Sequence, residues 1–213
     1  MFKGTPEIIT QRRDEIVAAC EQLYQMMSFR DITLKEIGNV TSFSRPTIYN
    51  YFHTKEEIFL ALYEREYDRW NADLEEILNS DGSYSGQQLA DLIAKSLEKR
   101  AQLLKLLSMN NFDMEENSRE ELLASFKRAY GRSLKLFREI LGKYCSDMSE
   151  SEAEQLMYIF FPFMFGIYPY AEVTAKQKEA MAEAAVDYKY QSIYEITYNC
   201  LKKLLSSDGR DGK

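Results

Sequence analysis

Cysteine and histidine are scarce in this chain of 213 residues. A single histidine, His53, is present, and the three cysteines are widely spaced, at Cys20, Cys145 and Cys200. A structural zinc site needs four ligands, chiefly cysteine and histidine at close spacing, so the sequence predicts no metal site. Isolated cysteines in odd number are typical of buried free thiols in a reducing compartment, and we therefore expect a cytoplasmic protein.

Sequence signatures of enzymes are also missing. The chain contains no GxSxG elbow, P-loop, HExxH motif or dinucleotide-binding fingerprint. Its one histidine lies inside the helical pattern described below, which leaves histidine-based acid–base chemistry without a site. We predict no catalytic residue and no cofactor. An enzyme on a helical scaffold stays as an alternative, which a buried polar constellation in a pocket would favour.

Long hydrophobic runs are few. Charged residues interrupt the first segment of the chain, at Lys3, Glu7, Arg12 and Arg13, so no signal peptide is predicted. The run Leu156–Ala171 is 16 residues long and contains two prolines and a glycine. A membrane-spanning helix needs about 20 apolar residues. We interpret this run as a buried helix and expect no membrane partner.

The sequence has no alternating strand pattern, and it predicts an all-α fold of about nine helices. Six capping boxes precede stretches with helical apolar spacing: Thr33/Glu36, Thr54/Glu57, Ser85/Gln88, Ser118/Glu121, Ser149/Glu152 and Thr174/Gln177. The spacing predicts long helices over about residues 6–27, 55–79, 86–107, 119–144, 150–171 and 175–206. Two short helices are expected between 33 and 52 and another near 109–114. The charged stretch 113–121 is expected to be a solvated loop.

The two short helices between Thr33 and Lys55 form the most informative pattern. Thr33 caps the first helix, while Ser44 caps the second and places Pro46 in its first turn, where a missing N–H costs little. The second helix separates an inward side from an outward side. Its inward residues are Ile48, Tyr51 and Phe52, and its outward residues are Arg45, Thr47, Tyr49 and Asn50. A short, supported helix with outward hydrogen-bonding side chains fits the major groove of DNA.

At this point the chain resembles the TetR family of bacterial transcriptional regulators, over about residues 10–62. The resemblance is carried by Met27-Ser28-Phe29, Thr33-Leu34-Lys35-Glu36-Ile37-Gly38, Phe43-Ser44, Thr47-Ile48-Tyr49, Tyr51-Phe52 and Thr54-Lys55-Glu56. Ser28 and Ser42 stand where the family usually has glycine. The resemblance implies an N-terminal three-helix helix-turn-helix DNA-binding domain over 1–54 and a C-terminal helical ligand-binding and dimerisation domain over 55–207. A flexible tail is expected at 208–213.

The candidate DNA-binding residues are Thr33, Ser44, Arg45, Thr47, Tyr49, Asn50, His53 and Lys55. Their roles stay open: Arg45 suits guanine or phosphate, and Tyr49 contacts DNA or packs within its own domain. Lys55, in the first turn of a helix, opposes the helix dipole, so we expect a DNA phosphate or a surface carboxylate beside it. His53 either contacts phosphate or is a spacer.

The charge distribution limits how DNA is bound. The net charge is −7, but residues 1–56 contain seven Lys/Arg and seven Asp/Glu, so the acidic excess lies beyond them. We therefore expect local phosphate contacts, whose affinity depends on two copies of the site.

The rest of the chain is rich in aromatic residues and methionine. Most of these belong to a core, but together they suggest an apolar cavity for a small ligand. The candidate pocket residues are Tyr67, Trp70, Met109, Phe112, Phe126, Tyr130, Phe160 and Met164. Pro162, inside a predicted helix, frees the carbonyl of Tyr158 as a possible acceptor for that ligand.

The helix over 150–171 is apolar on too many sides for the periphery of a monomer. We expect it to form a homodimer interface with the last helix, through Phe161, Phe165, Gly166 and Tyr168. The predicted function is a homodimeric repressor, released from a palindromic double-stranded DNA operator by a small hydrophobic effector. The alternative is a co-regulator of the same fold controlled by a protein partner.

Overall fold

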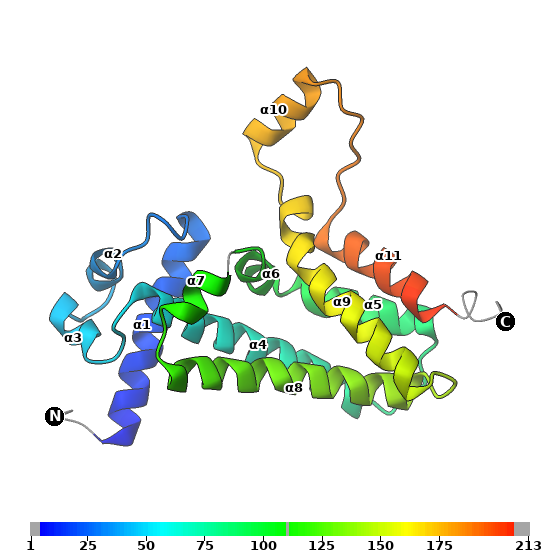
Figure 1. Cartoon of the computed structure of the whole chain (residues 1–213), viewed down its shortest axis with the longest axis horizontal. Coiled ribbons are helices and arrows are strands. Elements are labelled where there is room, and N and C mark those ends of the chain that lie inside the picture. Colours follow the sequence, from blue (N-terminus) through cyan, green and yellow to red (C-terminus); the bar gives the residue numbers. More distant parts are fainter. Residues whose placement is uncertain (1–4, 110, 207–213) are drawn as a thin grey trace. The chain divides into compact units, whose positions relative to one another are not determined.

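The structure, a computed structural model, describes residues 5–109 and 111–206, in which the chain forms eleven α-helices and no β-strand (Figure 1). The predicted all-α fold is confirmed. The chain divides into two compact units, one of Met1–Glu66 with Asn110–Tyr130 and one of Tyr67–Met109 with Gly131–Lys213. Two of the three boundaries between these units fall within α4 (Lys55–Asn79) and α8 (Glu120–Tyr144), and the third follows Met109, between two shorter helices. The predicted tail 208–213 lies outside the described residues.

The first unit is built from α1 (Pro6–Met26), α2 (Leu34–Asn39), α3 (Arg45–Tyr49), α7 (Asn111–Glu116) and the first parts of α4 and α8. The proline at the start of α1 occupies a position that lacks an intrahelical N–H partner in any case. The core of this unit joins α1, α2 and α3 to α4 through side chains that are fully buried: Ile16, Cys20, Ile37, Ile48, Phe52 and Phe59. These contacts hold the two short helices, which would not be stable alone.

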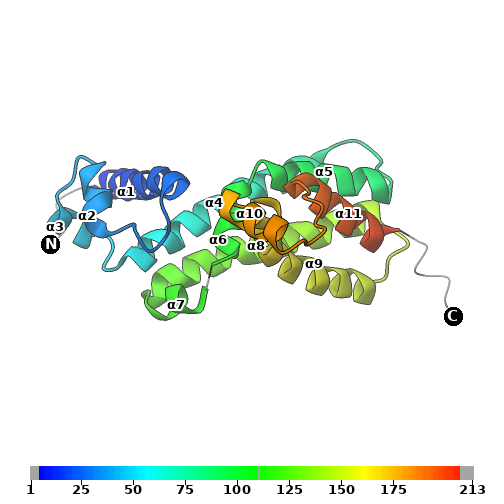
Figure 2. The same ribbon diagram turned by 90° about the horizontal axis from the view of Figure 1, so that it is seen from above.

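The second unit contains α5 (Gly86–Glu98), α6 (Ala101–Leu107), α9 (Glu150–Ala171), α10 (Ala175–Glu183), α11 (Ile193–Leu205) and the remaining parts of α4 and α8. Helix α11 lies alongside α5 and α9, and α6 packs on α9 (Figure 2). An aromatic cluster fills the centre, with the Phe137 ring 5.3 Å from Phe160 and 5.5 Å from Phe161, and Trp70 5.9 Å from Phe161.

One helix predicted over 86–107 is in fact two, α5 and α6. The backbone leaves the helical region at Arg100, with φ −112° and ψ 37°. The guanidinium of Arg100 donates to both carboxylate oxygens of Asp73 on α4, at 2.6 and 2.8 Å. A tertiary ion pair therefore accompanies a break that apolar spacing does not reveal.

The helix predicted over 175–206 is also two, α10 and α11. Ala185 adopts a left-handed conformation with φ 51°. The amide of Val186 donates to the carbonyl of Met181, and the amide of Ala185 donates to that of Ala182. This is a Schellman helix end, which usually has glycine where this chain has alanine. The sequence signal that the prediction missed is the capping box of Ser192 and Glu195 at the start of α11.

Three of the predicted capping boxes are confirmed. Complete capping boxes open α5, α9 and α10, as predicted. At Thr54, the hydroxyl accepts from the amide of Glu57, but the Glu57 carboxylate accepts from the amide of His53. The prediction of a solvated loop over 113–121 is partly wrong, because α7 extends to Glu116 and its Met114 is buried, with 2% exposure.

A membrane-spanning helix was not expected in this chain. Among the residues that the structure describes, no single helix has the length and apolar character to cross a membrane. Helices α9 and α10, bent by 81° at their junction, meet that criterion only as a pair.

Candidate nucleic-acid interface and effector region

The turn between α2 and α3 is held by hydrogen bonds from both sides. The hydroxyl of Thr33 accepts from the amide of Glu36 and also bonds its carboxylate, so the cap predicted at α2 is present. Glu15 of α1 accepts from both the amide and the hydroxyl of Ser42, at 3.0 and 2.8 Å. These bonds from Ser42 lower the pKa of Glu15. Ser42 thus fixes the turn through its side chain, and only Ala185 among the described non-glycine residues has a positive φ.

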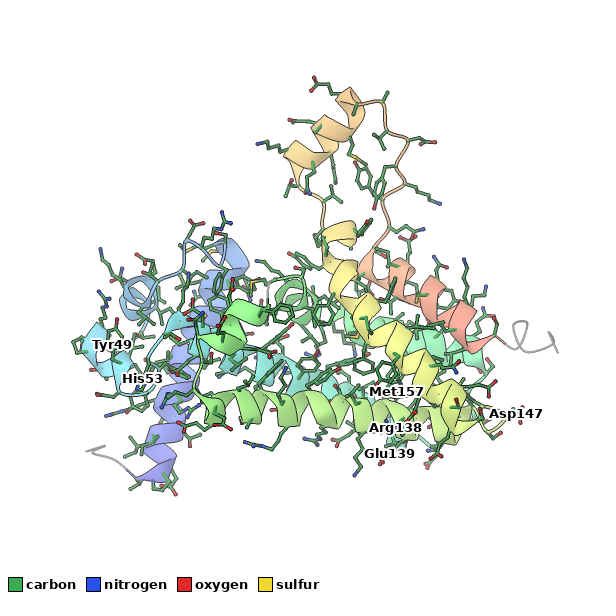
Figure 3. All side chains as sticks on the ribbon, in the orientation of Figure 1. Tyr49, His53, Arg138, Glu139, Asp147 and Met157 are labelled. Carbon is green, nitrogen blue, oxygen red and sulfur yellow. The ribbon has the colours of Figure 1, made fainter. Side chains whose placement is uncertain are left out.

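Helix α3 separates its faces as the sequence predicts. Ile48 and Phe52 are fully buried and Tyr51 is 6% exposed. On the other side, Arg45 and Asn50 are exposed, Thr47 is half-buried and Tyr49 is 40% exposed. Tyr49 and His53 lie at the same end of the first unit (Figure 3). The face turned to solvent therefore carries hydrogen-bonding groups on a support that is packed from behind.

Arg45 and Tyr49 act as a pair on this face. The guanidinium of Arg45 donates to the Tyr49 hydroxyl at 3.0 Å, and it lies 5.5 Å from the centre of the Tyr49 ring. The predicted cap at Ser44 takes another form, since its hydroxyl bonds that of Thr47 at 2.9 Å. Arg45 has further donors available after this contact, because a guanidinium has five N–H groups. The pair can present a planar donor group and an aromatic edge together.

Lys55 contacts a backbone carbonyl instead of the surface carboxylate that was one of its two predicted partners, and the other, a DNA phosphate, stays a prediction. Its ammonium donates to the carbonyl of Phe29 at 2.8 Å and lies 4.1 Å from the centre of the Phe29 ring. A backbone carbonyl and an aromatic face, rather than a carboxylate, therefore balance the cation at the start of α4. His53 is exposed, and its amide donates to Glu57.

Behind α3, the first unit contains an ion pair between a buried carboxylate and a half-buried guanidinium, which sequence reasoning missed. Glu57 is 1% exposed, and the guanidinium of Arg119 donates to its two oxygens at 2.8 and 3.0 Å. The same guanidinium donates to the carbonyl of Tyr51 at 3.0 Å. The amides of His53 and Arg119 also donate to the carboxylate. The pair ties the segment that follows α3 to the start of α8.

The pKa of Glu57 reflects this arrangement. Burial raises the pKa, but the hydrogen bonds from Arg119 and from the amide of His53 outweigh it, so the net shift is downward. The pKa of Arg119 is raised by its bond to Glu57. The charged form of both groups is therefore favoured in the folded chain.

The predicted pocket residues occupy varied positions. In the second unit, Tyr67, Trp70, Phe160 and Met164 are buried, and the Trp70 indole donates to Ser96 at 3.0 Å, while Met109 is half-buried. In the first unit, Phe126 is buried and stacks on Tyr63 with 4.9 Å between ring centres, Tyr130 is half-buried and Phe112 is 84% exposed. The set therefore consists mainly of core residues.

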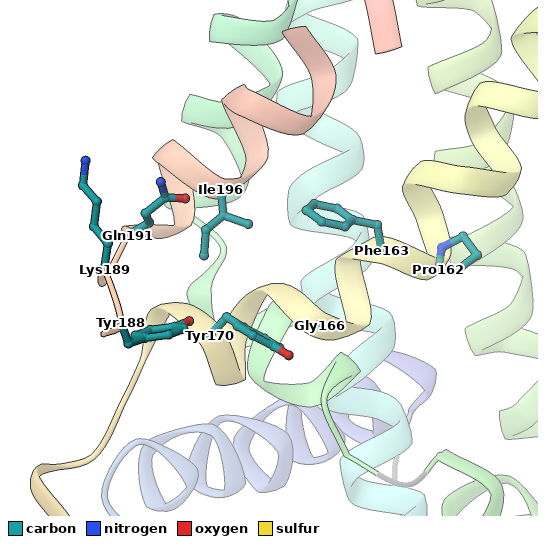
Figure 4. Close-up of a pocket in the computed structure, with 8 residues that line it drawn as sticks. All are labelled: Pro162, Phe163, Gly166, Tyr170, Tyr188, Lys189, Gln191 and Ile196. Carbon is teal, nitrogen blue, oxygen red and sulfur yellow. The ribbon is translucent and has the colours of Figure 1, made fainter. Parts of the chain in front are cut away.

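Two apolar cavities lie elsewhere in the second unit, beside α9 and α10. One has a volume of about 440 Å³ and is lined by Pro162, Phe163, Gly166, Tyr170, Tyr188, Lys189, Gln191 and Ile196 (Figure 4). The other, of about 350 Å³, is lined by Pro169, Tyr170, Val173, Gln177, Ala180, Met181, Tyr188 and Tyr190. None of the predicted pocket residues lines either cavity. Both include residues of the segment 184–192, which was predicted to be helical.

Within the described part of the second unit, the buried polar atoms Nε2 of Gln102 and Oγ1 of Thr197 have no hydrogen-bond partner. Thr197 is fully buried on α11. Burying an unpaired polar group costs about 1–3 kcal/mol. A polar atom of this kind in a core is a candidate contact for a ligand.

We expect Thr197→Val to raise the free energy of unfolding by about 1 kcal/mol, because a methyl group replaces the unpaired hydroxyl at nearly equal volume. Urea unfolding followed by circular dichroism measures this change. Thr47→Val, at a half-buried position where the hydroxyl is bonded, is the control and should give no gain. A loss of stability in Thr197→Val would contradict the assignment of an unpaired hydroxyl.

The residues predicted to form a dimer interface separate into two groups on α9. Phe161 is 5% exposed and packs among Trp70 and Phe137, so its ring is not available to a partner. Phe165 is 43% exposed, and Gly166 and Tyr168 are half-buried. Sequence reasoning omitted the more exposed apolar residues of this helix, which are Tyr158 at 81%, Tyr170 at 61% and Ile159 at 52%. Tyr158 and Ile159 lie four and three residues before Pro162, and Tyr170 lies eight residues after it, and this helical spacing is the signal that marks the face.

Comparison with known protein families gives two matches. Residues 16–62 match the family described as bacterial regulatory proteins, tetR family. Residues 64–189, more than half of the chain, match the family described as tetracyclin repressor-like, C-terminal domain. The HTH-type transcriptional repressor NemR of Escherichia coli strain K12 is 32% identical over 79 residues. That match covers 37% of this chain and 40% of the length of NemR.

Solved structures share the fold at low sequence identity. The fatty acid degradation regulator FadR from Bacillus halodurans superposes with a TM-score of 0.58 and 15% identity, over 97% of this chain and 98% of that one. FadR from Bacillus subtilis, solved in complex with stearoyl-CoA, has a TM-score of 0.59 and 14% identity, over 90% and 97% of the two chains.

Proposed function

This chain belongs to the TetR family of bacterial transcriptional regulators, and from that membership we propose that it is a cytoplasmic homodimeric repressor that a small, largely apolar ligand releases from a palindromic DNA operator. The observation that carries the proposal is the outward face of α3. Its hydrogen-bonding side chains stand on a fully buried support of Ile48 and Phe52.

We assign the contacts with DNA by the position of each side chain. Arg45, Thr47, Tyr49 and Asn50 reach base edges or the sugar–phosphate backbone from α3. Thr33, Ser44 and His53 are exposed around it and contact phosphates. Lys55 contributes chiefly by fixing Phe29 against the start of α4, since its ammonium already donates to that carbonyl.

The ligand is proposed to bind in the second unit. Its aromatic core, with Tyr67, Trp70, Phe160 and Met164, is where a pocket would open, and Met109 of the same unit completes the proposed set. A buried threonine hydroxyl without a partner, at Thr197, would meet a polar atom of the ligand. The stearoyl-CoA complex of FadR from Bacillus subtilis supports a ligand with a long apolar chain.

The experiment that tests this function is selection of DNA from a random pool, combined with sedimentation. We expect a palindrome whose half-sites are centred about 34–36 Å apart, one turn of DNA, because a two-fold dimer presents α3 twice. Sedimentation should give twice the mass of one chain, which is 24.9 kDa. A stable monomer at micromolar concentration would contradict the proposed dimer. A selected pool without any enriched sequence would contradict specific DNA binding.

A second candidate is a co-regulator of the same fold that answers to a protein partner. The exposed apolar face of α9 and the isolation of α10 favour it. It predicts that no small apolar ligand changes the affinity for the selected DNA. Titration of the DNA complex with stearoyl-CoA and shorter acyl chains therefore separates the two candidates.

A further inference from the structure

Four positions on α9 lie four residues apart and form one ridge along the helix: Tyr158, Pro162, Gly166 and Tyr170. Tyr158 is 81% exposed at one end of this ridge. Gly166 leaves a gap nearer the other end, because a Cβ added there would meet no atom within 4 Å. Ridges of residues spaced by four are the surfaces by which helices pack together. This ridge therefore offers both a projecting ring and a gap.

The larger apolar cavity lies beside the gap. Pro162, Gly166 and Tyr170 line it from the ridge, and Tyr188 and Gln191 line it from the segment between α10 and α11 (Figure 4). Its volume of about 440 Å³ falls in the range that encloses small apolar ligands, so a single aromatic side chain fits. The Tyr188 hydroxyl and the Gln191 amide supply polar groups for the tip of such a side chain.

Helix α10 and its two connecting segments form an arm that projects from the rest of the second unit (Figure 1). None of the nine residues of α10 is buried. Val186 and Tyr190, which follow α10, are 48% and 40% exposed. A helix this short is marginal in water without a packing surface. The arm thus gains most from a partner that covers its apolar side.

We propose that the cavity is filled by Tyr158 of a second copy of the chain, an inference that rests on the proposed homodimer. A two-fold axis across α9 pairs the two copies of this helix in antiparallel directions. With the axis at Pro162, position 158 of one copy faces position 166 of the other, because each lies four residues from the axis. The projecting ring of each copy then enters the gap of its partner, and the arm covers it.

The test is the dimer dissociation constant, measured by sedimentation equilibrium on the full chain. Tyr158→Ala should raise it by about 30-fold to about 1000-fold, since a buried tyrosine anchor is worth a factor of about 30 and each dimer loses two. Phe112→Ala, which removes an aromatic ring that is 84% exposed in the first unit, is the matched control and should leave it unchanged. Equal dissociation constants for parent and Tyr158→Ala would overturn the inference while the homodimer stands. If the parent chain itself sediments as a monomer, the proposed homodimer is contradicted instead.

A positional swap makes the test specific to these two residues. Gly166→Tyr alone should also weaken the dimer, because two rings then compete for one gap. The double variant Tyr158→Gly with Gly166→Tyr exchanges the ring and the gap and keeps the composition of the helix, so we expect it to recover most of the parent affinity. A double variant weaker than both single variants would show that position 158 does not face position 166.

Discussion

Arg119→Met is expected to lower the free energy of unfolding by about 3–5 kcal/mol, the largest single effect on stability that we expect in this chain. The change removes the guanidinium from Glu57, whose side chain is 1% exposed, and leaves a buried carboxylate with only amide donors. It also leaves the Tyr51 carbonyl without its donor from Arg119. Urea unfolding followed by circular dichroism measures the loss, provided that the slope of the free energy of unfolding against urea concentration is the same in the variant and the parent chain.

Arg132→Met is the matched control for this prediction. Arg132 pairs with Glu75 at 2.6 Å, but the two side chains are 51% and 39% exposed. An exposed ion pair contributes about 0–1 kcal/mol, so the control should lose little. Equal losses in the two variants would mean that the Glu57 carboxylate is not buried in solution.

The pH dependence gives a second check on the same pair. Burial raises the pKa of Glu57, but its hydrogen bonds lower it further, so the folded pKa lies below the ordinary value of 4.5. A carboxyl with a lowered folded pKa stabilises the fold fully above its unfolded pKa. That contribution is lost as the pH falls from about 4.5 through the folded pKa. The acid-induced loss of stability should be smaller in Glu57→Gln than in the parent chain.

The elements that sequence predicts well are those whose signals are local. Complete capping boxes at Ser85, Ser149 and Thr174 begin helices as expected, since each box satisfies amides within one turn. The two faces of α3 were also predictable, because a two-turn helix between buried neighbours fixes which side is covered.

The helix breaks were not predictable from periodicity. At Arg100 the helix ends beside an ion pair with Asp73, a residue 27 positions earlier in the chain. At Ala185 it ends in a left-handed conformation that costs alanine about 1–2 kcal/mol. Neither position carries glycine or proline, so neither has the local residue type that usually signals an end.

The partners of charged residues at the candidate site were equally hidden. The Lys55 ammonium binds a carbonyl 26 positions away, and Glu57 binds a guanidinium 62 positions away. From the sequence, an anion was expected beside the cation at the start of α4. The repulsion between that cation and the helix dipole was the only electrostatic effect that the local sequence revealed. In the fold, the carbonyl and the ring of Phe29 compensate this charge instead, and residue spacing does not predict that contact.

Arg45→Ala and Tyr49→Ala should each weaken binding to the selected operator while the dimer stays folded. A lost base contact costs about 1–3 kcal/mol, which corresponds to about 5–150-fold in affinity for each half-site. Both side chains are exposed, so stability should change by no more than about 0.5 kcal/mol. Fluorescence anisotropy at several salt concentrations measures the affinity and also separates base contacts from phosphate contacts. A lost phosphate contact lowers the salt slope by about 0.9 per site, whereas a lost base contact leaves it unchanged.

The bond between the Arg45 guanidinium and the Tyr49 hydroxyl makes the two substitutions interdependent. If Tyr49 serves mainly to orient Arg45, the double variant should lose little more than Arg45→Ala alone. Tyr49→Phe, which keeps the ring and removes the hydroxyl, should then reproduce most of the loss seen in Tyr49→Ala. If the Tyr49 ring itself contacts a thymine methyl or a sugar, Tyr49→Phe should bind like the parent and the two alanine losses should add. Parent-like binding by both alanine variants at every salt concentration would mean that another surface of the chain holds the DNA.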